Sequence, residues 1–170
     1  ALSQGFDDEV SNAVSDHYLP IGNSSQTPRK PISYTVAIAD KIDTLIGFFL
    51  INEKPSSSKD PFALRRSAIG LLKTIIDNKL NLKLRYLIDY NIKLYTEQGV
   101  KNENQNIENE LLSFLRERMK SILKDKNIKN DIIEASVSSY FSDNYFDLYK
   151  KNTLMNKYIS KEAGKNAINS

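Results

Sequence analysis

The chain has 170 residues and a net charge of +3, enough length for one domain or one and a half with a core that needs no cross-links. It contains no cysteine, which excludes disulfides, thiolate chemistry and zinc fingers and fits a reducing cytoplasm. No apolar run approaches the roughly 20 residues that span a bilayer, so no membrane partner is expected. The mild positive charge permits a nucleic-acid partner but does not require one.

The first predicted element is a short helix over 5–18, where early acidic residues favour the first turn. It ends before Pro20, because the residue that precedes a proline is disfavoured in the helical region. His17, the only histidine, lies at this helix end. A capping or packing role is a stronger interpretation for it than a metal ligand or a general base. A loop rich in glycine, serine and proline follows.

A long helix is predicted around the sequence VAIADKIDTLIGFFL, which begins at Val36. Its apolar residues recur at the spacing of one helix face, which indicates packing on a core. They are Ile38, Ile42, Leu45, Ile46 and Phe49. Asp40 and Asp43 share another face with Val36 and Gly47. Because glycine has no side chain, Gly47 can admit a close partner there.

A second core helix is predicted after the turn at 55–59. Asp60 is expected to cap it and Pro61 to occupy its first position. Its apolar face comprises Leu64, Ala68, Leu71, Leu72, Ile75 and Ile76. Arg65 lies at the head of an apolar stripe, where a buried arginine needs a partner. An ion pair with Asp40 or Asp43 is therefore expected.

A third helix is predicted over 80–95, and the composition changes after it. The segment TEQGVKNENQNIEN, at 96–109, is rich in asparagine and almost without apolar residues, which is typical of a linker or a flexible surface loop. We therefore place a domain boundary here, which divides the chain into 1–95 and 110–170.

The next predicted helix, over 107–123, carries both apolar and basic residues. Its buried side comprises Leu111, Leu115, Met119 and Ile122, with Arg118 on the same face. The opposite side carries Arg116, Lys120 and Lys124, spaced by four, which indicates a solvent-exposed basic stripe. Such a stripe is more often a solvated face, but it also has the form of a linear contact with RNA phosphates.

At least two more helices are predicted over 130–159. Asn130 or Asp131 is expected to cap the first and Asp143 the second. This part is rich in aromatic residues that could stack on bases, although at helical spacing they are more often core. They are Tyr140, Phe141, Tyr145, Phe146, Tyr149 and Tyr158.

Three sequence motifs occur along the chain in an order that is typical of one protein family. The first two are ADKIDTLIGFF and, after a short spacer, KPSSSKDPFALRRSAIGLLKTI. The third is LLSFLRERMKSILKDKNIKNDIIEASVSS, and the agreement weakens after Ser139. Together they closely resemble the beta subunit of the bacterial two-subunit glycyl-tRNA synthetase. The third motif resembles the start of the anticodon-binding domain in that family.

The resemblance implies an all-α fold, with an HD-like helical domain at 1–95, a polar linker at 96–109 and the start of a helical anticodon-binding domain at 110–170. The chain would then be an internal segment of a beta subunit. It would bind tRNA(Gly), while the alpha subunit activates glycine with ATP and Mg in a cytoplasmic hetero-tetramer. No cofactor is expected in this segment.

The resemblance and the charge pattern together predict the site residues. The expected tRNA contacts are Lys59, Arg66, Arg116, Lys120 and Lys124. No catalytic residue or metal ligand is expected, because one histidine, no cysteine and scattered serines form no nucleophile–base set.

Two alternative functions remain open at this point. The sequence IADKIDTL also resembles the last element of HD-type metal phosphohydrolases, in which Asp40 would be a metal ligand and His17 a further site residue. The chain has no His-Asp pair to complete that metal set. A purely structural helical scaffold would instead make salt-insensitive protein contacts and have no RNA affinity.

Overall fold

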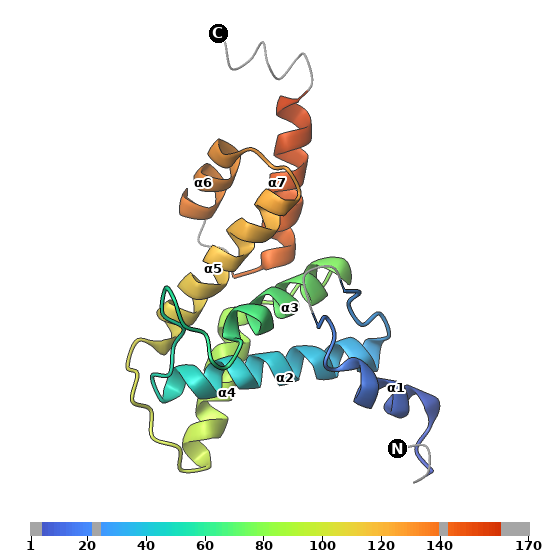
Figure 1. The fold of residues 1–170 in the computed structure, drawn as a ribbon, viewed down its shortest axis with the longest axis vertical. Coiled ribbons are helices and arrows are strands. Elements are labelled where there is room, and N and C mark those ends of the chain that lie inside the picture. The colour runs from blue at the N-terminus through green and yellow to red at the C-terminus, as the bar shows by residue number, and fades with distance from the viewer. Residues whose placement is uncertain (1–4, 22–24, 140–142, 161–170) are drawn as a thin grey trace.

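The computed structural model describes residues 5–21, 25–139 and 143–160, in which it contains seven α-helices and no strand. The all-α prediction is confirmed. The helices are α1 (Asp8–Asp16), α2 (Pro31–Leu50), α3 (Leu64–Asp77), α4 (Leu84–Glu97), α5 (Ile107–Asp125), α6 (Asn130–Ser139) and α7 (Tyr145–Ile159). Figure 1 shows α2 and α3 side by side, with α5, α6 and α7 grouped on one side of them. Within the described ranges, no helix combines the length and hydropathy needed to cross a membrane.

Helix α2 lies at the centre of the fold and packs against α1, α3, α4 and α5. It begins earlier than predicted, at Pro31, a position that suits proline because the first helical amide needs no partner. The predicted apolar face is buried: Ile38, Ile42, Leu45, Ile46 and Phe49. Because Ala37 and Leu50 are buried as well, more than one face of α2 is covered.

The predicted close partner of Gly47 is Tyr95 of α4. A Cβ atom at position 47 would lie 2.8 Å from the Tyr95 hydroxyl oxygen. This hydroxyl donates to Asp43 Oδ1 at 2.9 Å. Burial, and then the hydrogen bond to Asp43, raise the pKa of Tyr95 to about 12. The contacts of Gly47 and Asp43 with Tyr95 therefore help to position α4 on α2.

Helix α3 begins at Leu64, later than predicted. Pro61 lies in the preceding turn, which ends with Ala63 in the left-handed region at φ 55°. Asp60 still caps the helix, because its Oδ1 accepts from Leu64 N at 2.8 Å and its Oδ2 from Arg65 N at 3.0 Å. The predicted cap is confirmed, and the predicted helical position of Pro61 is wrong.

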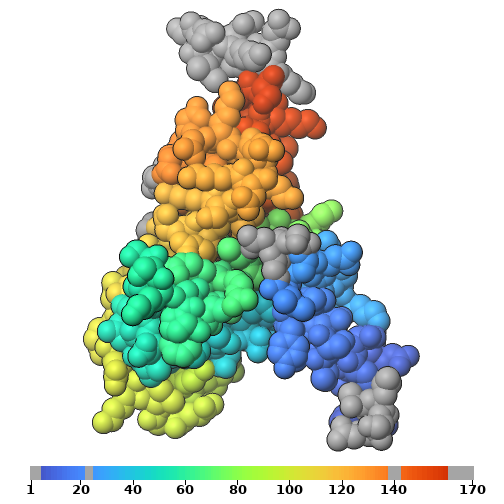
Figure 2. Space-filling model, viewed as in Figure 1, coloured from blue at the N-terminus to red at the C-terminus, as the bar shows by residue number. Residues whose placement is uncertain are grey.

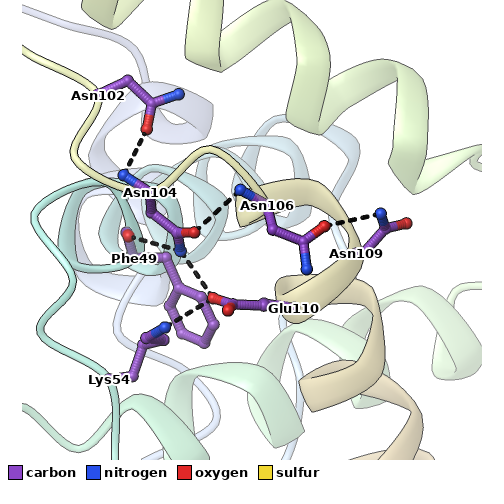
Figure 3. Close-up of polar contacts among 7 residues, drawn as sticks. All are labelled: Phe49, Lys54, Asn102, Asn104, Asn106, Asn109 and Glu110. Atoms are coloured by element: carbon purple, nitrogen blue, oxygen red, sulfur yellow. Dashed lines mark hydrogen bonds and ion pairs between the residues drawn. The ribbon is translucent and has the colours of Figure 1, made fainter.

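The polar segment before α5 is bound to the end of α2 (Figure 3). Asn104 is 7% exposed, and its Nδ2 donates to the backbone oxygen of Phe49 at 3.3 Å. Asparagine side chains also hold the loop backbone: Asn102 Oδ1 accepts from Asn104 N at 2.9 Å, and Asn104 Oδ1 from Asn106 N at 3.1 Å. The asparagines thus bind the loop backbone to itself and to the end of α2, and the linker interpretation of 96–109 stays a prediction.

Glu110 of α5 completes this network (Figure 3). Its Oε2 accepts from Lys54 Nζ and from Asn104 Nδ2, each at 2.7 Å. These hydrogen bonds, first that of Lys54 and then that of Asn104, hold the pKa of Glu110 below its ordinary value. The start of α5 is therefore tied to the chain segment that follows α2.

One apolar cluster extends across the predicted domain boundary. It contains buried residues of α2, α3 and α4 together with residues of α5, α6 and α7. Helix α3 packs on both α5 and α7. The parts 1–95 and 110–170 therefore share a core. Their division into an HD-like and an anticodon-binding domain stays a prediction.

The cap of the last described helix, α7, differs from the predicted one. Asn144 caps α7, since its Oδ1 accepts from Asp147 N at 3.1 Å. Asp143 instead caps α4: its backbone oxygen accepts from Leu84 N at 3.2 Å and its Oδ2 from Arg85 N at 3.3 Å. The predicted role of Asp143 at α7 is therefore wrong, because α7 starts one residue too late for it.

The aromatic residues of α7 are divided between core and surface. Tyr145 is 1% exposed and donates to a backbone carbonyl of α5, and Phe146 and Tyr149 pack partly buried against the core. Tyr158 is 59% exposed. The core interpretation is confirmed for the first three. Two further members of the predicted set lie outside the described residues: Tyr140 and Phe141.

We expect Glu110 to make the stability of the fold depend on pH. Because the folded pKa is lowered, ionised Glu110 stabilises the fold above its ordinary pKa of about 4.3, and this contribution is lost as the pH falls through the folded pKa. Glu110→Gln should therefore lower the melting temperature at neutral pH, and the difference from wild type should shrink in acid. Thermal unfolding from about pH 7 to about pH 3 checks this. Glu53→Gln, at an exposed glutamate, is the control. A difference that stays constant in acid would contradict it.

The contact between Gly47 and Tyr95 predicts a sign change in a double-mutant cycle. Gly47→Ala should destabilise the wild type, because the new Cβ displaces the Tyr95 hydroxyl from Asp43. In a Tyr95→Phe background the hydroxyl is gone, so Gly47→Ala should stabilise the fold by about 1 kcal/mol through helix propensity. Urea unfolding of the four proteins measures both effects. Equal effects in the two backgrounds would show that the contact does not constrain position 47.

Candidate nucleic-acid interface

Three of the five predicted tRNA contacts are exposed to solvent. Lys59 lies in the turn before α3, Arg66 in the first turn of α3, and Lys124 in the last turn of α5. Arg66 also lines a cavity of about 430 Å³ together with Tyr18 and Lys41. These three cations are therefore accessible to a phosphate, and their contact with RNA stays a prediction.

The other two predicted contacts, Arg116 and Lys120, have partners within the protein. Lys120 Nζ lies 3.0 Å from Glu134 Oε2 of α6 and 3.3 Å from Glu117 Oε1, and its side chain is only 20% exposed. The glutamate hydrogen bonds raise the pKa of Lys120. Arg116 interacts with the buried hydroxyl of Tyr145. The prediction of a continuous exposed basic stripe is therefore wrong at these two positions, because α6 and α7 face α5 there.

Arg65 pairs with a different carboxylate from the two predicted. Its Nη1 lies 3.8 Å from Asp60 Oδ2, and its guanidinium also donates to the backbone oxygens of Ser56 and Lys59. The cause is the turn at 61–63, which brings Asp60 back to the first turn of α3. The expected pairing with the α2 carboxylates is thus replaced by a local one.

Asp40 and Asp43 are both exposed and serve other contacts. Asp43 accepts from Tyr95, as described above. Asp40 adjoins Lys41, which is 5% exposed and donates from Nζ to the backbone oxygen of His17 at 2.8 Å. Burial lowers the pKa of Lys41, and the neighbouring charge of Asp40 partly opposes that change.

Arg118 is a candidate contact that the sequence pattern assigned to the buried side of α5. It is half-buried, and its guanidinium carbon lies 4.9 Å from the centroid of the Phe114 ring. Burial, and then the positive charge of Arg65, lower the pKa of Arg118, while Glu117 and Asp60 oppose the change. Arg118 therefore lies within electrostatic reach of Asp60, which precedes α3, and of Arg65 in the first turn of α3. In the sequence, the position of Arg118 between apolar residues was the feature that could have identified it as a candidate contact, because a cation in an apolar stripe needs a partner.

The two residues of the phosphohydrolase alternative, His17 and Asp40, line the same cavity. It has a volume of about 610 Å³, and its other lining residues are Asp43 and mostly apolar side chains. His17 Nδ1 is engaged with the backbone oxygen of Val14 at 2.7 Å, which fits the capping interpretation. Among the described residues, no group of three or more histidine, cysteine or acidic side chains could hold a metal ion. This arrangement gives no support to metal-dependent hydrolysis.

Comparison with known families decides the relationship of the chain. A sequence model of the glycyl-tRNA synthetase beta subunit matches residues 1–138, well over half of the chain. The chain belongs to this family. The resemblance carried by the three motifs is thereby confirmed.

Several glycine–tRNA ligase beta subunits are similar to this member of the family over 99% of its length. The protein of Ruegeria sp. (strain TM1040) is 38% identical over 168 residues, that of Rickettsia canadensis (strain McKiel) 38% over 172, and that of Rhodospirillum centenum (strain ATCC 51521 / SW) 36% over 171. The chain spans 23–24% of the length of these beta subunits. The similarity extends beyond Ser139, where the motif agreement weakened.

Asp60 is expected to be more important for stability than Asp40, one of the two α2 aspartates that were predicted to pair with Arg65. Asp60→Ala removes the cap from Leu64 and Arg65 and also the ion pair, and should destabilise the fold by about 1–2 kcal/mol. The matched control, Asp40→Asn, should change stability by less than about 0.5 kcal/mol. Denaturant unfolding compares the two. A larger effect of Asp40→Asn would support the original pairing.

Proposed function

We propose that this chain is a tRNA-binding part of a glycine–tRNA ligase beta subunit. The observation that carries the proposal is the family match over residues 1–138, which is joined by similarity to named beta subunits along 99% of the chain. The exposed cations Lys59, Arg66 and Lys124 support it physically, since phosphate contacts from lysine and arginine supply most of the affinity for nucleic acid.

The proposal includes a division of labour between two subunits. The alpha subunit would activate glycine with ATP and Mg, and the beta subunit would bind and position tRNA(Gly). The two subunits would form a cytoplasmic hetero-tetramer. The residues of this chain would then bind and orient RNA without performing a covalent step. Unpaired anticodon bases and the shape of the RNA would supply discrimination, because the cations read only the backbone.

Binding to tRNA(Gly) and to a non-cognate tRNA, at low and at near-physiological salt, tests the proposal. We expect affinity to fall steeply with salt, as counterion release requires, with a preference for the cognate tRNA. Glutamate substitutions at Lys59, Arg66 and Lys124 should each weaken binding and reduce its salt dependence. The same substitution at Lys93, an exposed lysine of α4 outside the predicted contacts, is the control.

The glutamate substitutions at Lys59, Arg66 and Lys124 should also be tested in the complete two-subunit enzyme. This experiment distinguishes a segment that needs its neighbours to bind tRNA from one that is only a structural scaffold. Binding that appears only in the complete enzyme and falls with these substitutions would support the proposal and show that this segment needs its neighbours. If neither the chain nor the complete enzyme responds to them, the segment serves as a structural scaffold. That result would overturn the proposal.

A further inference from the structure

An apolar groove follows α2 between α1 and α4. Two cavities form it, of about 610 Å³ and 450 Å³, and they adjoin because Ala39 and Asn91 line both. Helix α1 contributes Val14 to one wall, and α4 contributes Leu87 and Tyr90 to the other. Figure 2 shows this part of the surface hollowed between α1, in blue, and α4, in yellow-green, and Figure 1 shows α2 passing between them.

Apolar side chains in this groove face solvent. Val14 of α1, Ile32 and Val36 of α2, and Tyr90 of α4 are each 40–56% exposed. Contiguous apolar surface that lines a groove is uncommon on a soluble monomer and marks a place where another molecule or segment binds. Covering these side chains would remove their apolar area from water, which is favourable.

The spacing of the exposed α2 residues indicates that a helix fits the groove. Ile32, Val36, Ala39 and Asp43 follow one another at intervals of 4, 3 and 4 residues. This is the spacing of a seam between two packed helices. The α1 wall has a similar helical spacing, with lining residues Val10, Val14 and His17. Two helices that are packed together, as α1 and α2 are, leave between them a groove that accepts a third.

The charge of the groove indicates what that helix carries. The described residues that line the two cavities include two carboxylates, Asp40 and Asp43, but neither lysine nor arginine. Asp43 accepts from Tyr95. No described residue donates to the Asp40 carboxylate or forms an ion pair with it, and the ammonium group of neighbouring Lys41 is directed to the backbone oxygen of His17. A segment that covers Asp40 must therefore supply a cation, because a buried carboxylate without a partner is strongly destabilising.

We propose that this groove docks an amphipathic helix of the same beta subunit, which places its apolar face on α2 and pairs a lysine or arginine with Asp40. The chain spans 23–24% of the length of the beta subunits to which it is similar, so most of such a subunit lies outside these 170 residues. A segment of the same polypeptide reaches the groove without the loss of translational freedom that a separate partner incurs. The inference rests on the part of the proposed function that makes the chain a portion of a beta subunit.

Thiol labelling in the complete beta subunit tests the proposal. The 170 residues contain no cysteine, so Val36→Cys places a single thiol in this part of the subunit, and peptide mass spectrometry reads its labelling. A water-soluble maleimide should label position 36 at least about tenfold more slowly in the complete beta subunit than in the 170-residue chain, because a covered thiol reacts only on local opening. Val14→Cys, on the opposite wall, should behave in the same way.

The matched control is Lys93→Cys, at an exposed lysine of α4 that does not line the groove. This position should be labelled at the same rate in the complete subunit and in the 170-residue chain. An equal slowing at position 93 would show that the protection is not specific to the groove and would overturn the docking site.

The cation is tested at Asp40 in the complete beta subunit that carries Val36→Cys. Asp40→Lys places a like charge against the docked cation and should raise the labelling rate at position 36 about tenfold or more. Asp40→Glu keeps the negative charge and should keep most of the protection. Unchanged protection in Asp40→Lys would overturn the pairing with a cation.

Other occupants of the groove give different results. Protection that appears only when the alpha subunit is added, or only at high concentration of the beta subunit, would identify the alpha subunit or a second copy and overturn the proposal. Rapid labelling of position 36 in the complete two-subunit enzyme would show that the groove stays open, which also overturns it.

The outcomes separate this inference from the proposed function. If the complete enzyme binds tRNA and position 36 is freely labelled, the docking site is wrong and the proposed function stands. If position 36 is protected in the complete beta subunit while neither the chain nor the complete enzyme binds tRNA, the tRNA-binding role fails and the docking site stands.

Discussion

The burial of α2 is the constraint on which the rest of the structure depends. Four helices pack around it, and its neighbours α3 and α5 carry the core into the final part of the described chain. Because a helix covered on several sides cannot expose its polar groups to water, each of them must find a partner or reach the edge. The helices on either side of the asparagine-rich loop contribute to the same core.

The polar groups of α2 are accommodated by small residues and backbone carbonyls of its neighbours. The stem of Lys41 passes Gly70 of α3, where a Cβ atom would lie 2.9 Å from Lys41 Cε, and its ammonium group reaches the end of α1 at His17. Within α2 itself, Asp43 accepts the hydrogen bond of the Tyr95 hydroxyl from α4, and Gly47 leaves the room that this hydroxyl needs. Glycine thus leaves room for the polar contacts of α2 with the end of α1 and with α4 while its apolar faces stay packed.

The helices and their apolar faces could be predicted from the sequence because periodicity is a local property. The family could be predicted from ordered motifs, and the room beside Gly47 from the absence of a side chain. Contacts between elements could not be predicted. Lys120 meets a glutamate of α6, and Arg65 depends on the geometry of the turn at 61–63. The segment at 96–109 has the composition of a linker, but its asparagines bind backbone groups that composition alone does not locate.

The cap of α4 by Asp143 has a consequence for how the chain folds during synthesis. The capped amide of Arg85 and the carboxylate of Asp143 are 58 residues apart. At about 5–20 residues per second, the ribosome adds Asp143 several seconds after the start of α4. The first turn of α4 therefore lacks this cap in the nascent chain until Asp143 has been added and reaches it. Its amide protons report the completion of the last part of the described fold, not the formation of α4 itself.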